Sequence, residues 1–118
     1  MTFLDGKKIL IVEYQPLVAA DIEDRLLDAG VESVAIVSKP GQALPPLADQ
    51  DAIIINATQD RPLAQQVFAQ GNGSCAFIVL HDDPSRARDL FPGTVIVEIP
   101  FDSGTIRDAL IEALRPEG

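Results

Sequence analysis

The chain has 118 residues, of which 47% are hydrophobic and only 5% aromatic, so we predict a single domain over residues 1–118 with an aliphatic core. The formal net charge is −9, and the lysines and arginines are scattered. This excludes direct nucleic-acid binding, which needs a concentrated basic face. No apolar run is long enough to span a bilayer, and no signal-peptide pattern is present, so we expect a cytoplasmic protein without membrane contact.

The first third of the chain predicts a strand, a helix and a second strand. Residues 9–13 begin with a continuously apolar run, which is typical of a parallel strand covered on both faces. Pro16 suits the first turn of the following helix. Apolar residues then recur at helical spacing from Val18 to Leu26, and Gly30 ends the helix. Residues 33–37 form the second predicted strand.

The next segment should hold a helix by topology, but its sequence opposes one. Pro45 and Pro46 lie between the second strand and the third, which we place at residues 52–56. Proline in a helix interior removes a hydrogen bond and clashes with the preceding turn. We therefore predict a very short or distorted second helix.

The rest of the chain repeats the alternation of helix and strand. We predict a helix from Asp60 to Gln70, a strand at 76–80, a short helix at 85–90, a strand at 94–98 and a last helix capped by Asp102. Five strand–helix units predict a flavodoxin-like (βα)5 fold. This α/β fold is a three-layer sandwich around a parallel five-stranded sheet in the order 2-1-3-4-5.

The carboxyl ends of the predicted strands are where such a sheet places its chemistry. Glu13 and Tyr14 follow the first strand, Asn56 ends the third, His81 follows the fourth and Ile99 follows the fifth. The set lacks both a carboxylate nucleophile and a lysine. We therefore predict no catalytic residue, no bound metal and no cofactor, and a protein that signals by shape and contacts.

Three segments resemble the receiver domain of two-component response regulators. They are the run from Lys8 to Val18, the run from Asp51 to Asn56, and Pro100 with the residue after it. The resemblance spans nearly the whole chain. It implies two acids that hold Mg²⁺ after the first strand and an aspartate phosphoacceptor after the third. It also implies a serine or threonine after the fourth strand and a lysine after the fifth.

The chain departs from that pattern at four positions. Tyr14 stands in place of the second acid, Asn56 of the phosphoacceptor, His81 of the hydroxyl residue and Ile99 of the lysine. A neutral amide is not a usable nucleophile and is a weaker cation ligand than a carboxylate. We interpret the chain as a degenerate or pseudo-receiver, and we expect Ile99 and Tyr14 to fill the former pocket with apolar surface. The family also implies a cis peptide bond before Pro100.

The polar residues at this edge also have simpler interpretations. Asn56 is then a hydrogen-bonded residue at a strand end, and His81 bonds a neighbour. Glu13 with Asp60 or Asp82 suggests a weak cation site, but two acids from separate loops are an unspecific pattern. We interpret these acids as solvated surface.

Three functions remain open. The first is phosphorylation-independent binding to a protein partner, which is a histidine kinase, a phosphotransfer protein or an effector. The second is a switch phosphorylated on an unusual acceptor such as Asp51, Asp60 or His81, although Asp51 begins its strand at the opposite end of the sheet. The third is a small-ligand binder, for which only Tyr14 and Phe101 offer aromatic rings near the strand ends. We favour the first.

The resemblance implies two binding surfaces. One is formed by the helix at 85–90, the strand at 94–98 and the last helix, which receivers use for effector contact or a homodimer. The other surrounds the first helix, which receivers offer to kinases or phosphotransfer proteins. Here the first helix is acidic, with Asp21, Glu23, Asp24 and Asp28.

Overall fold

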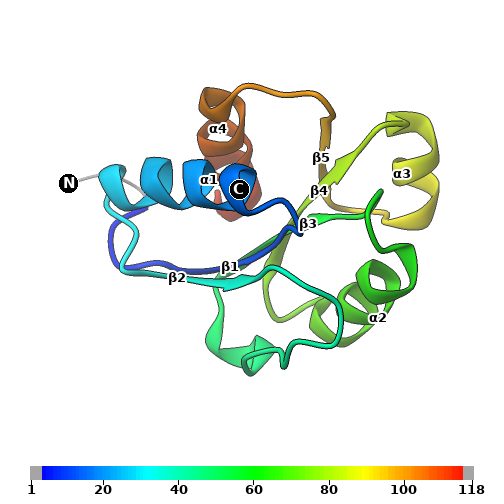
Figure 1. The fold of residues 1–118 in the computed structure, drawn as a ribbon, viewed down its shortest axis with the longest axis horizontal. Coiled ribbons are helices and arrows are strands. Elements are labelled where there is room, and N and C mark those ends of the chain that lie inside the picture. The colour runs from blue at the N-terminus through cyan, green and yellow to red at the C-terminus, as the bar shows by residue number, and fades with distance from the viewer. Residues whose placement is uncertain (1–3, 116–118) are drawn as a thin grey trace.

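The computed structural model describes residues 4–115, which form one parallel sheet in the order β2-β1-β3-β4-β5 and so confirm the predicted topology. Figure 1 shows α1 and α4 against one face of the sheet and α2 and α3 against the other. None of the helices in this part of the chain is long and apolar enough to cross a membrane. The elements are β1 (Lys8–Val12), α1 (Pro16–Asp28), β2 (Ser33–Val37), η1 (Leu47–Asp49), β3 (Ala52–Asn56), α2 (Arg61–Gly71), β4 (Ala76–His81), α3 (Pro84–Leu90), β5 (Val95–Glu98) and α4 (Ser103–Leu114).

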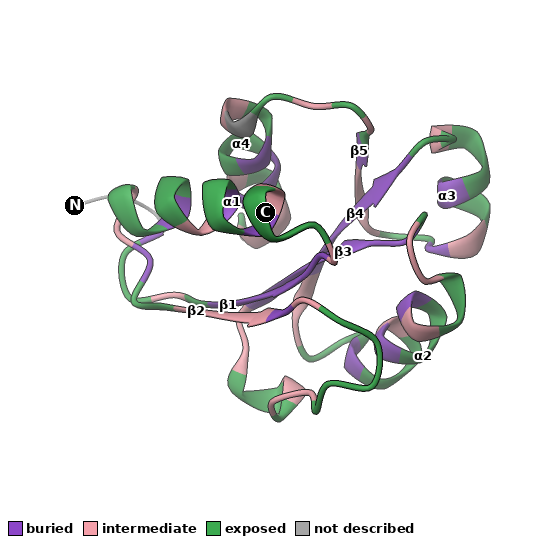
Figure 2. Ribbon diagram, in the orientation of Figure 1, coloured by how far each residue is buried: buried purple, intermediate pink, exposed green. Residues whose placement is uncertain are grey.

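The central strands are buried on both faces, as Figure 2 shows for β1, β3 and β4. All five residues of β3 are buried, including the polar Asn56. A side chain on either face of this strand meets a helix layer, so the strand contains no alternation of apolar and polar residues. This explains why the apolar runs of the sequence are continuous.

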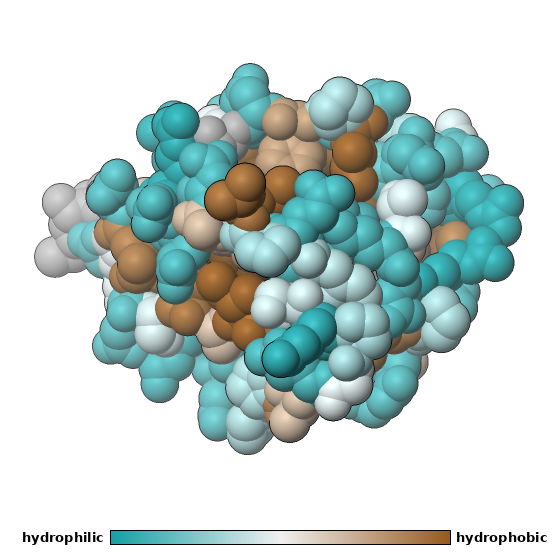
Figure 3. All heavy atoms as spheres, viewed as in Figure 1, coloured by the Kyte–Doolittle hydropathy of each residue, from teal (hydrophilic) through white to brown (hydrophobic). Residues whose placement is uncertain are grey.

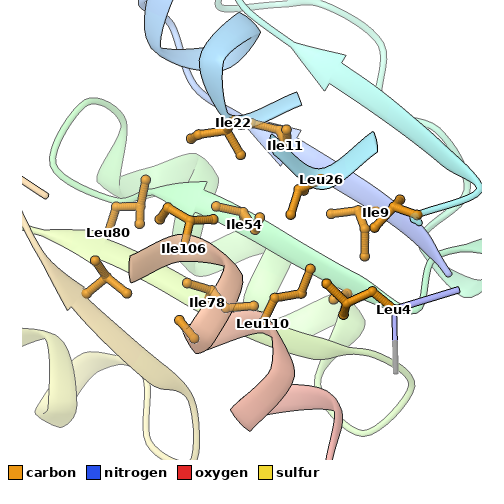
Figure 4. Close-up of a cluster of buried hydrophobic side chains, with 14 residues drawn as sticks. Leu4, Ile9, Ile11, Ile22, Leu26, Ile54, Ile78, Leu80, Ile106 and Leu110 are labelled. Carbon is orange, nitrogen blue, oxygen red and sulfur yellow. The ribbon is translucent and has the colours of Figure 1, made fainter. Parts of the chain in front are cut away.

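One half of the core lies between the sheet and the helices α1 and α4 (Figure 4). Ile22 and Leu26 of α1 and Ile106 and Leu110 of α4 are at most 1% exposed. They pack over Ile54 of β3, in one cluster with side chains from β1 and β4. The cluster is aliphatic, as the composition predicts.

The other half of the core lies under α2 and α3. Here Phe68 of α2 contacts Phe77 of β4 and Phe91 after α3 edge to face, with ring centroids 5.4 and 5.6 Å apart. Val67 of α2 packs in the same cluster. Of the aromatic rings in residues 4–115, those of Tyr14, Phe68, Phe77 and Phe91 pack on this face of the sheet, and that of Phe101 packs on the other.

Three helices begin at an aspartate whose side chain accepts a hydrogen bond from the first turn. Asp60 Oδ1 accepts from Leu63 N at 3.0 Å, and Asp83 and Asp102 do the same for α3 and α4. Each bond satisfies a backbone donor that has no partner within the helix. Helix α1 has no such cap and begins with Pro16 instead.

The connection between β2 and β3 contains only the 3₁₀ helix η1, which agrees with the short or distorted helix expected around Pro45 and Pro46. The preceding strand, β2, is an edge strand that pairs only with β1. Gln42 Nε2 donates to Ile36 O at 3.0 Å, and Gln42 Oε1 accepts from Ser38 N at 2.9 Å. One side chain therefore occupies two backbone groups at this edge.

Tyr14 connects the loop after β1 to the start of α2. Its hydroxyl donates to Asp60 Oδ2 at 2.7 Å, and its backbone N–H donates to Gln59 Oε1 at 2.8 Å. Burial, followed by the hydrogen bond to Asp60 and the charge of that carboxylate, raises the pKa of Tyr14 from 10.0 to about 12. The ring packs on the α2 side of the sheet.

Ile54→Ala tests the core between the sheet, α1 and α4. Ile54 is fully buried, so the substitution should lower the free energy of unfolding by about 2–5 kcal/mol, through lost burial and the cavity left behind. Leu17→Ala is the control because Leu17 is 86% exposed, and its effect should stay within about 0.5 kcal/mol. Urea unfolding of both variants measures the difference, and equal losses would contradict this assignment of the core.

Tyr14 is the only tyrosine of the chain, so an absorbance titration of tyrosinate reports its pKa directly. We expect a midpoint near 12. In Asp60→Asn, which retains an acceptor for the α2 cap, the midpoint should fall but stay above the value of a free tyrosine, because burial remains. A raised folded-state pKa favours the neutral hydroxyl, so this stabilisation is complete below the unfolded-state pKa of 10.0 and is lost as the pH rises through about 12. A midpoint unchanged by the substitution would contradict the contact.

Candidate functional site

The register of the sheet brings the candidate residues to one edge. Val12 lies opposite Ile55, so Glu13 follows β1 beside the end of β3. His81, at the end of β4, lies opposite Glu98, the last residue of β5. The strand ends that the sequence predicts to converge therefore do converge.

Glu13 and Asn56 form a hydrogen-bonded pair inside this edge. Asn56 Nδ2 donates to Glu13 Oε1 at 3.0 Å, and Gln15 N donates to Glu13 Oε2 at 3.0 Å. Glu13 is 2% exposed and Asn56 8%. A carboxylate at position 56 would instead bring a second negative charge to within about 3 Å of Glu13, which requires a cation or a proton between them.

The amide oxygen of Asn56 is also engaged. Asn56 Oδ1 accepts from Thr58 N at 3.1 Å and from Gln59 N at 3.3 Å. The side chain thus bonds Glu13 through its nitrogen and the turn after β3 through its oxygen. This agrees with the simpler interpretation of Asn56 as a satisfied polar residue at a strand end.

A pocket of about 380 Å³ opens between the start of α1 and the residues after β5. Our expectation that Ile99 and Tyr14 fill this space is wrong. Ile99 forms part of the wall, whereas Tyr14 is directed toward Asp60 on the other face of the sheet. The lining residues are Glu13, Gln15, Leu17, Val18, Asp21, Asn56, Ile99, Pro100 and Phe101.

His81 lies next to a different cavity, of about 670 Å³, which Arg61 and Arg86 also line. Its Nδ1 accepts a hydrogen bond from Asp83 N at 2.8 Å and lies 3.1 Å from Asp82 Oδ1. The structure therefore places His81 and Glu13 at separate cavities.

The residues after β5 are fixed against β4. Ile99 N donates to His81 O at 3.0 Å, and the peptide bond between Ile99 and Pro100 is cis. Ile99 and Pro100 both contribute to the wall of the Glu13 pocket.

The structure does not bring Asp60 or Asp82 to Glu13. Asp60 is bonded to Tyr14 and to the first turn of α2, and Asp82 is bonded to Thr58. Within residues 4–115, no group of three or more histidine, cysteine, aspartate or glutamate side chains is arranged to hold a metal ion. Of Glu13, Asp60 and Asp82, only Glu13 lines the pocket beside α1.

Sequence reasoning missed the pocket residues contributed by α1. Leu17 and Asp21 are four residues apart in the chain, which puts them on the same helix face, and both line the pocket. That spacing is readable from the sequence. The anchoring of Asn56 by Thr58 and Gln59 has no such signal, because both residues act through their backbone N–H groups.

No protein family model and no curated protein matches this chain. Solved structures do match. The signal receiver domain of an HD domain-containing protein from Pseudomonas fluorescens is 24% identical, with a TM-score of 0.73, over 92% of this chain and 94% of that one. A response regulator receiver domain from Methylobacillus flagellatus is 18% identical, with a TM-score of 0.70, over 92% of this chain and 99% of that one.

A response regulator receiver protein from Sinorhizobium medicae is also similar. It is 19% identical, with a TM-score of 0.64, over 94% of this chain and 96% of that one. Each likeness covers almost the whole of both chains and includes the sheet order 2-1-3-4-5. The chain therefore has the fold of response regulator receiver domains.

Proposed function

We propose that this chain is a degenerate receiver domain that acts in two-component-type signalling by binding a protein partner, without phosphorylation or catalysis. The observation that carries the proposal is the position of Asn56. A neutral amide stands at the end of β3, and its nitrogen and oxygen are both hydrogen-bonded within the site. It offers no nucleophile to a phosphoryl group.

The surroundings of Asn56 support the same conclusion. Two acids line the pocket, of which Glu13 is buried and Asp21 is exposed on α1, and Tyr14 is bonded to Asp60 instead. Position 99 contributes an aliphatic side chain in place of a cation. Nucleophile, second metal ligand and phosphate clamp are therefore replaced together, and a signal has to pass through surface contacts.

The partner is a histidine kinase, a phosphotransfer protein or an effector, in the cytoplasm. Two surfaces are available. The α3–β5–α4 face would contact an effector or a second copy of the chain, and the acidic face of α1 would contact a kinase or phosphotransfer protein. The net charge of −9 favours a partner with a basic or mixed surface.

Incubation with a small-molecule phosphodonor and Mg²⁺ tests the proposal. The intact mass of the protein should not change, while a receiver with the phosphoacceptor aspartate gains one phosphoryl group in parallel. Amide NMR with Mg²⁺ and then beryllofluoride should show no saturable change near Glu13, Asn56 and His81. An adduct on any residue would favour the unusual acceptor, and shifts spreading to α3 and β5 would show that the pocket still switches.

Asn56→Asp tests the geometry on which the proposal depends. The new carboxylate would replace a donor 3.0 Å from buried Glu13, so the free energy of unfolding at neutral pH should fall by about 1–3 kcal/mol. Like charges raise the folded-state pKa of the pair above its unfolded value. The loss should therefore be greatest at neutral pH and shrink as the pH falls.

The control for this variant is Asn72→Asp, the same chemical change at an exposed position after α2. It should change the stability by no more than about 0.5 kcal/mol. Mg²⁺ should recover part of the stability of Asn56→Asp and leave the wild type and the control unchanged. Equal losses in both variants would show that Asn56 and Glu13 are not paired as described.

A further inference from the structure

A pocket lies beside Glu13. Its volume of about 380 Å³ lies within the range of about 300–1,000 Å³ that is usual for small-ligand sites. Figure 3 shows apolar surface gathered at the start of α1 and beneath the loop from β5 to α4, the two segments that border the pocket. A ligand there would touch both apolar and acidic side chains.

The pocket is lined by one buried carboxylate. Glu13 is 2% exposed and accepts one hydrogen bond on each oxygen, from Asn56 and Gln15. A carboxylate can accept about four hydrogen bonds, so two acceptor positions remain. None of the ion pairs found within residues 4–115 involves Glu13. An opposite charge close to a carboxylate favours its ionised form.

The residues at the walls and the rim of the pocket indicate the polarity and charge of a matching ligand. Leu17, Val18, Ile99 and Phe101 supply the apolar wall, and Leu17 is 86% exposed. Asp21 lies at the exposed rim, four residues after Leu17 on the same helix face. The lining contains no lysine, arginine or histidine. A positive group on a short aliphatic stem therefore matches the pocket in both charge and polarity.

We infer that this pocket binds an aliphatic cation, a primary ammonium group whose stem covers Leu17 and Ile99 while the charge reaches Glu13. This inference goes beyond the proposed function, because the ligand would bind whether or not the surface faces recruit a protein. The ammonium group belongs either to a free alkylamine or to a lysine side chain of another protein. Both present the same chemistry to the pocket.

The test is an amide NMR titration of the full chain with butylammonium chloride. Saturable shifts are expected at Gln15, Leu17, Asn56 and Ile99, with a Kd on the order of millimolar, as suits a ligand of so few atoms. Butanol has the same stem without the charge, and sodium chloride supplies ionic strength alone. Neither should produce the same saturable shifts.

Substitutions of the acidic residues test whether binding depends on their charge. Asp21→Asn removes an exposed charge and should weaken binding roughly two- to fivefold. Asp24→Asn is the matched control, because Asp24 is exposed on the same helix but does not line the pocket; it should leave the Kd unchanged. Glu13→Gln should weaken binding by about tenfold or more. If Glu13→Gln does not fold, the comparison of Asp21→Asn with Asp24→Asn still tests whether binding depends on an acid that lines the pocket.

A short peptide with blocked ends and one lysine distinguishes the two sources. Tighter binding than butylammonium at the same amides would assign the pocket to a protein lysine, and no binding of the peptide would assign it to a free amine. Equal shifts with butanol would overturn the inference, as would the absence of saturable shifts. Saturable binding of Mg²⁺ that excludes butylammonium would overturn it too, by showing a metal site. The phosphodonor experiment is independent of all these outcomes.

Discussion

The hydrogen bond from Asn56 to Glu13 is the interaction on which the candidate site depends. It joins the ends of β1 and β3 inside the protein, where an unpaired charge is costly. Two carboxylates at this distance need a cation between them, whereas an amide and a carboxylate satisfy each other directly. With an amide at position 56, the end of β3 offers Glu13 a hydrogen-bond donor in place of a second negative charge.

The pocket beside this pair is open because the neighbouring side chains are held elsewhere. Tyr14 is bonded to Asp60 on the α2 side, and the residues after β5 are bonded to β4. Ile99 contributes one wall of the pocket. This edge of the sheet therefore contains a cavity, and buried Glu13 contributes an acidic group to its wall.

Most of the fold could be predicted from the sequence because its strands are buried on both faces. The bounds of β2 and β3 and the order of the sheet agree with the apolar runs, and the irregular β2–β3 connection follows from Pro45 and Pro46. The direction of Tyr14 could not be predicted. It depends on a partner 46 residues away in the chain, and neither residue type nor spacing specifies that contact. The pocket is open because of this long-range hydrogen bond between Tyr14 and Asp60.

The irregular connection also has a consequence for the behaviour of the protein in a crowded solution. An open strand edge presents unpaired N–H and C=O groups that can recruit strands from other molecules and start aggregation. The side chain of Gln42 imitates a neighbouring strand at the end of β2 by offering one donor and one acceptor. One glutamine side chain therefore occupies two backbone groups that an added strand would need, at the place where a regular helix is missing.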